Sequence, residues 1–553
     1  MEAFIIQNMA PIMFVALVLF LLLGYPAAFS LGAVGLIFGL IGIELGQFAP
    51  DFLQALPDRI YGVMSNDTLL AIPFFTFMGL VLERSGMAED LLDTVGQLFG
   101  TIRGGLAYAV IFVGALLAAT TGVVAASVIS MGLISLPIML RYGYDRRVAS
   151  GVIAASGTLA QIIPPSLVLI VMADQLGRSV GDMYEGAFIP GLVLSLLYAI
   201  YVFIVTLLYP KATPGLPPEA VGFREPSGGR GLTSLGVLTV VSGLFGWFMM
   251  RGSDTHGADF IVLSMFFGIM FAFGVAVVNW LTSRLVNFRF LSHIAQQTTF
   301  VMVPPLFLIF LVLGTIFIGV ATPTEGGAMG ASGALILGAI KRRLNWDLIR
   351  QATESTAKLS AFVVFILIGA RVFSLTFYGV SGHIWVESLL TSLPGGQIGF
   401  LIFVNAFVFV LAFFLDFFEL AFIVIPLLGP AAEHLGIDLI WFGVILGVNM
   451  QTSFMHPPFG FALFYLRSVA PRDTFVDRVT GKRTEGVTTG QIYWGAVPFV
   501  GIQVLMVLLV ILFPAMVMHY KGAASTIDLN KVKIEIPQID LPPPSIQFNI
   551  PSK

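Results

Sequence analysis

The sequence predicts an all-α membrane protein built from two inverted repeats, each with a re-entrant hairpin and a broken helix. Three observations lead to this prediction. The 553-residue chain is 57% hydrophobic and 11% charged, whereas a soluble domain carries about 25% charged residues. The same pattern of Pro, Gly and Asp occurs twice at one fixed offset. Lysine and arginine gather in loops that we expect on one side of a membrane.

The repeat is defined by residues that recur 293 positions apart. Apolar stretches of matching length lie between these markers. A repeat of this length in so apolar a chain indicates a duplicated membrane half, and duplicated halves with broken helices are the usual architecture of secondary transporters. The pairs that share the offset are Pro137 with Pro430, Gly143 with Gly436, Pro164 with Pro457, and Gly86 with Gly379 (430−137, 436−143, 457−164, 379−86).

Four regions are expected. They are a first repeat at 1–209, a linker with two extra transmembrane helices at 210–297, a second repeat at 298–515 and an extracytoplasmic tail at 516–553. In the first repeat we expect spans at 9–24, 26–45 and 68–84, an amphipathic stretch at 87–101, a hairpin at 105–140, a broken helix at 147–174 and a span at 187–209. The linker spans are placed at 234–250 and 258–281. In the second repeat we expect spans at 299–319, 326–340 and 358–378, a hairpin at 398–431, a broken helix at 438–468 and a span at 491–514.

The arms of the first hairpin, 105–119 and 123–140, are each short for a span of about 20 residues. Their junction at 118–122 is small and polar. The two arms are either two tight spans or, as we favour, a re-entrant hairpin with its tip inside the membrane. Irregular backbone at that depth is stable only where it lines protein or a water cavity. If both hairpins re-enter, each half crosses the membrane five times, and the second half is inverted.

The distribution of basic residues tests this topology. With the N-terminus outside, the outside loops before the tail contain only Arg59, Arg178 and Arg251. The inside loops contain Arg103, Arg141, Arg146, Arg147, Lys211, Arg224, Arg230, Arg284, Arg289, Lys341, Arg342, Arg343, Arg350, Arg472, Arg478, Lys482 and Arg483. This positive-inside bias requires both hairpins to re-enter and places the C-terminus outside. The tail reads as an extended segment, either disordered or a docking arm.

Composition excludes several functions. The chain has no cysteine, so disulfides, thiol catalysis and cysteine metal sites are excluded. The first apolar run, at 11–23, lacks a basic region before it and is read as a transmembrane helix rather than a signal peptide. No Walker motif, metal-ligand cluster, nucleophile elbow or Rossmann fingerprint occurs. The sequence therefore predicts neither an enzyme nor an ATP-driven transporter, and it predicts no cofactor.

Each broken helix carries a Pro-Pro pair, which removes backbone donors and clashes with the preceding turn. Unwound carbonyls and side-chain oxygens suit Na⁺, and exposed half-helix N-termini suit an anion. The alternative is a packing kink whose hydroxyls bond back to the helix; two breaks in symmetric places favour a binding site. Ion-binding candidates here are Ser156, Gly157, Thr158, Asn449, Thr452 and Ser453, and substrate-binding candidates are Pro165, Ser166 and Pro458.

The hairpin tips supply further ion-binding candidates. The first tip is Thr120, Thr121 and Gly122, and the second contains Asp416. An ionisable residue in an apolar run is a functional candidate, although Asp416 could instead cap the second helix of its hairpin. Glu419 lies three residues further on and shares a helical face with Asp416.

Two basic side chains lie near these segments. Arg371 lies inside the span at 358–378 and needs an acidic partner or an anionic ligand. It either pairs with Asp416 or Glu419, or binds a substrate carboxylate. His456 precedes the second proline pair and is read as structural more readily than as a proton relay.

At these residues the chain resembles the large membrane subunit of TRAP (tripartite ATP-independent periplasmic) transporters. The resemblance covers about 1–209 and 298–515. It lies in the segments Asn66 to Phe75, Met139 to Asp145, Ser156 to Leu159, Ile163 to Ser166, Ala321 to Glu325 and Phe414 to Asp416.

The resemblance implies a Na⁺-coupled, elevator-type importer of an organic acid in the bacterial inner membrane. It implies two partners, a small four-helix membrane subunit and a periplasmic substrate-binding protein. The hairpins and broken helices would form the moving transport domain, and the flanking helices the scaffold. The chain departs from the family pattern at the first tip, where Gly122 and Val123 follow Thr121, and at Met455 and His456.

Two other readings remain. A stand-alone ion-coupled anion symporter would share the broken-helix architecture. A membrane-embedded enzyme should show a clustered acid–base or metal set, and the sequence shows none.

Overall fold

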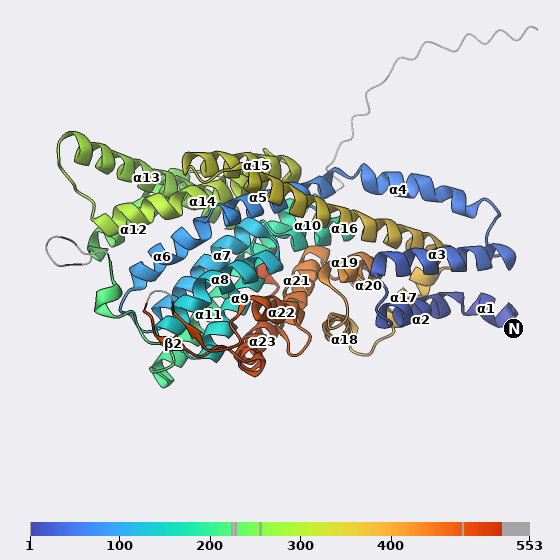
Figure 1. Ribbon diagram of the computed structural model, residues 1–553. Coiled ribbons are helices and arrows are strands. Elements are labelled where there is room, and N and C mark those ends of the chain that lie inside the picture. The colour runs from blue at the N-terminus through green and yellow to red at the C-terminus, as the bar shows by residue number, and fades with distance from the viewer. Residues whose placement is uncertain are drawn as a thin grey trace, which may run out of the picture. The chain divides into compact units, whose positions relative to one another are not determined.

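The computed structural model describes residues 2–521, apart from 223, 224, 226–228, 230, 254–256, 478, 479 and the side chains of Thr120 and Thr121. Within these residues the regular secondary structure is helical, apart from one two-stranded antiparallel sheet (Figure 1). Eight of the described helices are long and apolar enough to cross a membrane, or up to eleven if each bent pair counts as one span. The prediction for the tail lies outside the described residues from 522 onward.

The first repeat contains the predicted spans, hairpin and broken helix. Its elements are α1 (Glu2–Gln7), α2 (Met9–Leu22), α3 (Ala27–Glu44), η1 (Phe52–Ala55), α4 (Leu56–Met64), η2 (Asp67–Leu70), α5 (Ala71–Arg84), α6 (Met87–Phe99), α7 (Gly105–Thr121), α8 (Val124–Arg141), α9 (Arg146–Thr158), η3 (Leu159–Gln161), α10 (Leu167–Gln175) and α11 (Val180–Leu208). The region 210–297 contains η4 (Pro218–Ala220) and two long helices, α12 (Leu232–Met250) and α13 (Gly257–Leu285).

The second repeat follows the same order of elements. They are α14 (His293–Phe317), α15 (Pro323–Ile340), α16 (Trp346–Gly379), α17 (Gly382–Thr391), α18 (Gly396–Leu411), α19 (Phe417–Ile423), α20 (Ile425–His434), α21 (Leu439–Met455), α22 (Phe461–Val469), β1 (Phe475–Val476), β2 (Arg483–Thr484), α23 (Thr489–Leu512) and α24 (Ala515–Met518). In the sheet, Phe475 pairs with Thr484 and Val476 with Arg483.

Helix boundaries recur at the predicted offset of 293. The broken helices α9 and α21 begin at 146 and 439 (439−146 = 293), and the hairpins end at 141 and 434 (434−141 = 293). Each broken helix ends before its proline pair, but the ends are not at the same offset: α9 ends at Thr158 and is followed by η3, whereas α21 continues to Met455 (455−158 = 297). The inverted orientation of the two halves in the membrane stays a prediction.

Some boundaries differ from the prediction. Helix α16 begins 12 residues before the predicted span at 358–378. Its first turns are polar and carry the Arg350–Glu354 ion pair, so hydropathy alone does not detect them. Helix α11 begins at Val180, after an N-cap at Ser179, rather than at 187. Helices α4 and α17 were not predicted.

Glycines allow two pairs of helices, α3 with α16 and α9 with α23, to pack closely. A Cβ atom added at Gly369 of α16 would lie 2.4 Å from the Ala28 carbonyl oxygen of α3. One added at Gly151 of α9 would lie 2.1 Å from the Gly495 carbonyl oxygen of α23. A Cβ atom would clash at either position, so only glycine lets these helices approach so closely. We therefore group α23 with the broken helices, whereas the sequence placed the flanking helices in the scaffold.

Candidate functional site

Both hairpin tips border one cavity of about 520 Å³. Gly122 of the first tip and Asp416 of the second line it, together with Gln161 at the first helix break and Phe362 of α16. The fold thus brings the two tips and the first break to one cavity. Helix α16 supplies another part of the cavity wall, and it packs on α3.

The first tip is shaped by a glycine. Gly122 ends α7 in the left-handed conformation, with φ of 58°, and its N–H donates to the Ala118 carbonyl. A Cβ atom here would lie 3.0 Å from Leu167 Cγ at the start of α10. Gly122 is therefore suited to the turn and to contact with the helix break. The side chains of Thr120 and Thr121 lie outside the described residues.

The second tip is shaped by a carboxylate pair. Asp416 caps α19: its Oδ1 accepts from the Glu419 N–H at 2.8 Å, and Glu419 Oε2 accepts from the Asp416 N–H at 2.9 Å. The capping alternative for Asp416 is thus confirmed. Both half-buried side chains also line the cavity, so the cap brings two acidic groups to it. Two carboxylates this close favour binding of a cation.

Helix N-termini also face this cavity. Val124 begins α8, Leu167 begins α10 and Phe461 begins α22, and all three residues line it. The N-terminus of a helix carries partial positive charge and free N–H groups, which attract anions. Among the described lining residues there is no Lys, Arg or His. The cavity therefore combines donors for an anion with carboxylates for a cation.

The first break holds two buried oxygen atoms without a hydrogen-bond partner among the described residues. They are Ser156 Oγ and Gln161 Oε1, on side chains that are at most 2% exposed. Buried polar atoms are nearly always paired, so an orphaned oxygen indicates a bound water or ion. Thr158 differs, because its hydroxyl donates to the Ala155 carbonyl at 2.8 Å.

The second break shows the back-bonded pattern. The Thr452 hydroxyl donates to the Asn449 carbonyl, and the Ser453 hydroxyl donates to the Met450 carbonyl. These bonds are what the packing alternative predicts for Thr452 and Ser453. A hydroxyl oxygen that donates its hydrogen can still coordinate a cation through its lone pairs. The Asn449 side-chain amide donates to the Asn405 carbonyl of α18 at 2.8 Å, joining the second hairpin to its broken helix.

A buried amide network links the two breaks. Thr158 Oγ1 accepts from Gln451 Nε2 at 3.2 Å and from Gln503 Nε2 at 3.4 Å, and Gln503 also donates to the Tyr198 hydroxyl at 2.8 Å. Residues 158 and 451 are themselves 293 positions apart (451−158). The Oε1 atoms of both glutamines are buried and have no described partner. Each of these oxygens, like Ser156 Oγ, is of the type that a hard monovalent cation prefers as a ligand.

Five polar residues of this site were not predicted from the sequence as site residues: Gln161, Gln451, Gln503, Asn405 and Tyr198. Each is a polar residue inside a predicted apolar span, which is the signal that could have identified it.

Other predicted site residues have packing roles here. A Cβ atom at Gly157 would lie 2.4 Å from Val128 Cγ2, so this glycine lets α9 approach α8. The Ser166 hydroxyl donates to the Gln161 carbonyl at 2.7 Å and accepts from the Val168 N–H, capping α10. Pro165 is buried, whereas Pro458 is exposed. The Pro164–Pro165 and Pro457–Pro458 bonds are both cis.

Arg371 lies away from the cavity. It follows Phe362 by nine residues on α16 (371−362), which is about 13 Å along a helix. None of the ion pairs between described residues includes it. The alternative in which Arg371 pairs with Asp416 or Glu419 is therefore not formed in this structure, and its role in binding substrate stays a prediction. His456 instead stacks on Phe413 of the second tip, with ring centroids 3.7 Å apart, as its structural reading predicted.

Two hydrogen bonds connect α5 and the turn before it to the hairpin and the broken helix of the first repeat. The Ser130 hydroxyl of α8 donates to the Glu83 carboxylate of α5. The Asn66 side-chain amide, at the turn before α5, donates to Asp174 Oδ1 of α10 at 2.7 Å. Helix α5 itself packs on α15, α16 and α7. These bonds therefore join α5 and the turn before it to helices that the family resemblance assigns to a moving transport domain.

Comparison with known proteins identifies the family. The family model described as "Tripartite ATP-independent periplasmic transporter, DctM component" matches residues 14–516. The chain therefore belongs to the DctM family, the large permease subunits of TRAP transporters, and it is an integral inner-membrane protein. The resemblance inferred from the sequence is confirmed.

Individual relatives agree. The C4-dicarboxylate TRAP transporter large permease protein DctM of Pseudomonas aeruginosa is 27% identical over 85% of this chain and 89% of its own. The protein of the same name from Vibrio cholerae is 26% identical over 91% and 95%. The sialic acid TRAP transporter permease protein SiaT of Haemophilus influenzae is 22% identical over 75% and 56%.

A solved structure supports the fold. The YdaH transporter of Alcanivorax borkumensis aligns with a TM-score of 0.50 at 14% identity, over 85% of this chain and 90% of that chain. At this identity the likeness concerns the fold alone.

Proposed function

We propose that this permease subunit imports an organic acid by Na⁺-coupled secondary transport, with an elevator-like movement of its hairpins and broken helices. The observation that carries the proposal is the cavity between the tips, where helix N-termini meet the Asp416–Glu419 pair. One cavity thereby offers donors to an anion and acceptors to a cation.

The two ligands depend on each other electrostatically. An anion entering beside Asp416 and Glu419 is repelled unless a cation first neutralises the carboxylates. Orphaned oxygens at Ser156 and Gln161 offer further ligands close to the first break. Na⁺ would therefore bind first and raise the affinity for the anion, which is reciprocal coupling between two sites.

The class of substrate follows from charge and from the relatives. Proteins named for C4-dicarboxylate and sialic acid transport are similar to this chain along most of its length. Both substrates are carboxylic acids, and helix N-termini are suited to carboxylate groups. We therefore propose a carboxylate substrate for this chain as well.

Uptake into proteoliposomes tests the coupling. The chain would be reconstituted with a small membrane subunit and the cognate substrate-binding protein, and uptake of a radiolabelled dicarboxylate or sialic acid would be followed. We expect uptake with an inward Na⁺ gradient and none with K⁺ or choline at matched pH and membrane potential. Equal uptake in all three salts would contradict Na⁺ coupling.

The same system tests the partners. A TRAP transporter should need both proteins, whereas a stand-alone anion symporter would transport free substrate without them. Full uptake by the permease subunit alone would favour the symporter.

The elevator movement is tested by a cross-link. Glu83 of α5 and Ser130 of α8 are hydrogen-bonded, and the native chain has no cysteine. A disulfide in the double variant Glu83→Cys/Ser130→Cys should arrest uptake, and reduction should restore it. Unchanged uptake in the oxidised protein would contradict relative movement of α5 and α8. The matched control is Arg350→Cys/Glu354→Cys, which lies within α16 and should not respond to oxidation.

A further inference from the structure

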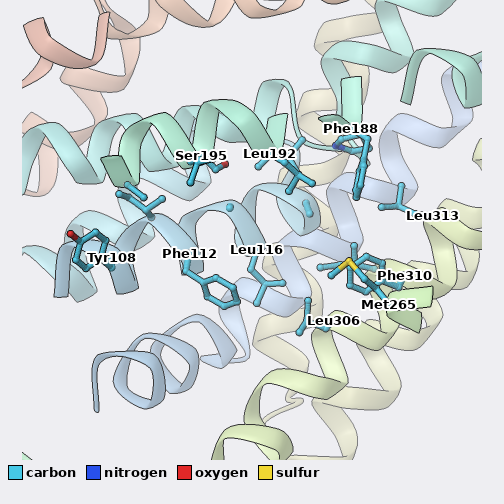
Figure 2. Close-up of a pocket in the computed structure, with 18 of the residues that line it drawn as sticks. Tyr108, Phe112, Leu116, Phe188, Leu192, Ser195, Met265, Leu306, Phe310 and Leu313 are labelled. Atoms are coloured by element: carbon cyan, nitrogen blue, oxygen red, sulfur yellow. The ribbon is translucent and has the colours of Figure 1, made fainter. Parts of the chain in front are cut away.

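A second cavity of about 540 Å³ lies outside the site at the tips (Figure 2). Helices α7 and α11 form one part of its wall, and α13 and α14 form the other. Figure 2 shows Phe112, Leu116 and Leu192 on the first part and Met265 and Phe310 on the second, all along one apolar space.

The lining offers almost nothing polar. Tyr108 and Ser195 are the polar side chains among the described lining residues. The Ser195 hydroxyl already donates to the Gly191 carbonyl at 2.9 Å, and Tyr108 is hydrogen-bonded to Thr206. Water in such a space would lack partners, so a hydrocarbon ligand fits it better.

The cavity has the length of one leaflet. Its lining runs from Tyr108 to Ala119 on α7 and from Phe188 to Ala199 on α11, which is 11 residue-to-residue steps on each helix (119−108, 199−188). That corresponds to about 16 Å along each helix, or half of a hydrocarbon core of about 30 Å. The far end is closed by Ile163 and Pro164 at the helix break.

The cavity opens toward the membrane. Leu196 of the lining is 58% exposed and Met265 is 43% exposed, and both lie on helices long and apolar enough to span a bilayer. Exposed apolar residues on such helices face lipid chains. A chain could therefore enter sideways without crossing the protein.

Two cations flank the Tyr108 end. Arg103 precedes α7 and Lys211 follows α11, and both side chains are exposed. Their loops are joined by the hydrogen bond from the Gly104 N–H to the Thr213 carbonyl at 2.9 Å. By the positive-inside rule this end lies at the cytoplasmic surface, where anionic headgroups attract basic side chains.

We propose that this cavity binds one acyl chain of an anionic phospholipid from the cytoplasmic leaflet, with its phosphate held by Arg103 and Lys211. The acyl chain lies between α7 and the first helix break on one side and α13 and α14 on the other. Bound lipid therefore stabilises the observed arrangement of these helices.

Photo-cross-linking tests the site without any substitution. Phosphatidylglycerol with a diazirine on its acyl chain would be added to the purified protein in nanodiscs, and adducts would be mapped by peptide mass spectrometry. We expect adducts on lining residues of both walls, such as Leu116 and Met265, and competition by unlabelled phosphatidylglycerol. Adducts confined to other helices would overturn the proposal, as would adducts that disappear when a co-purified membrane subunit covers these helices.

Native mass spectrometry sharpens the test. Ala199→Phe should fill the cavity and reduce retained phosphatidylglycerol at least several-fold, whereas Ile200→Phe, its lipid-facing neighbour on α11, should not. Arg103→Gln/Lys211→Gln should abolish the preference for phosphatidylglycerol over phosphatidylethanolamine, and the exposed control Lys482→Gln should keep it. Equal retention by Ala199→Phe and wild type, or an unchanged preference in the double variant, would overturn the site.

Discussion

The two hairpin tips share a backbone plan but differ in charge. Each tip lies against the break of its own repeat: Gly122 contacts Leu167, and Phe413 stacks on His456. The first tip turns through a glycine, whereas the second turns through the Asp416–Glu419 capping box. The two repeats therefore share the arrangement of tip against helix break, whereas the acidic groups that favour a cation come from the second repeat alone.

The two helix breaks also differ, in how their serine and threonine hydroxyls are hydrogen-bonded. At the first break, Ser156 Oγ and Gln161 Oε1 are buried and lack a described partner. At the second, the hydroxyls of Thr452 and Ser453 bond back to their own helix. Gln451 Oε1 near the second break is orphaned as well, so neutral oxygens of both breaks are candidate ion ligands together with the carboxylates of the second tip, and ion binding should depend on both repeats.

The largest effect is expected from Asp416. Asp416→Asn keeps an N-cap oxygen but removes a charge from the cavity, and an interaction with a charged group contributes about 1.5–3 kcal/mol. The apparent Na⁺ affinity of uptake should fall by about 10- to 100-fold. The matched control is Asp438→Asn, which keeps the N-cap of α21 outside the cavity. An unchanged Na⁺ dependence would show that Asp416 is only a cap.

The amide network should affect stability next. Gln503→Leu leaves Tyr198 without its donor and removes one donor from Thr158, both buried. Losing a buried partner costs about 1–3 kcal/mol, so thermal unfolding of the purified protein should shift downward. The lipid-facing control Val504→Leu on the same helix should leave the transition in place. A wild-type transition in Gln503→Leu would contradict the network.

Ser156 and Thr452 allow the breaks to be compared directly. Ser156→Ala removes an orphaned oxygen, so the apparent Na⁺ affinity should fall by about five-fold, equivalent to about 1 kcal/mol. Thr452→Ala removes a back-bonded hydroxyl and should change the affinity less. Titration of uptake against Na⁺ checks both variants. A larger loss of Na⁺ affinity in Thr452→Ala than in Ser156→Ala would show that the second break, rather than the first, supplies the stronger hydroxyl ligand.

The smallest effect is expected from coupling between Arg371 and Asp416. The two side chains belong to no common ion pair, so their substitutions should act independently, with a coupling energy within about 0.5 kcal/mol. The double variant Arg371→Ala/Asp416→Asn should transport no better than expected from the two single variants. Recovery of uptake or stability in the double variant would indicate a pairing in another conformation.

Local signals explain what the sequence could predict. Proline pairs, caps and apolar runs act within a few residues, so the sequence predicted both helix breaks, and the cap at Asp416 is an alternative that it left open. The amide network joins Thr158 to Gln503 across 345 positions, and no local pattern specifies such a contact. The position of Arg371 depends on how α16 packs, which the sequence also does not encode locally.

Equilibrium Na⁺ binding tests directly whether the charge of Asp416 contributes to the ion site. Isothermal titration of the purified permease subunit in a K⁺ buffer should show Na⁺ binding in the wild type, about 10- to 100-fold weaker binding in Asp416→Asn and wild-type binding in Asp438→Asn. Wild-type Na⁺ affinity in Asp416→Asn would contradict the account, because the charge of the second tip would then not contribute to the ion site.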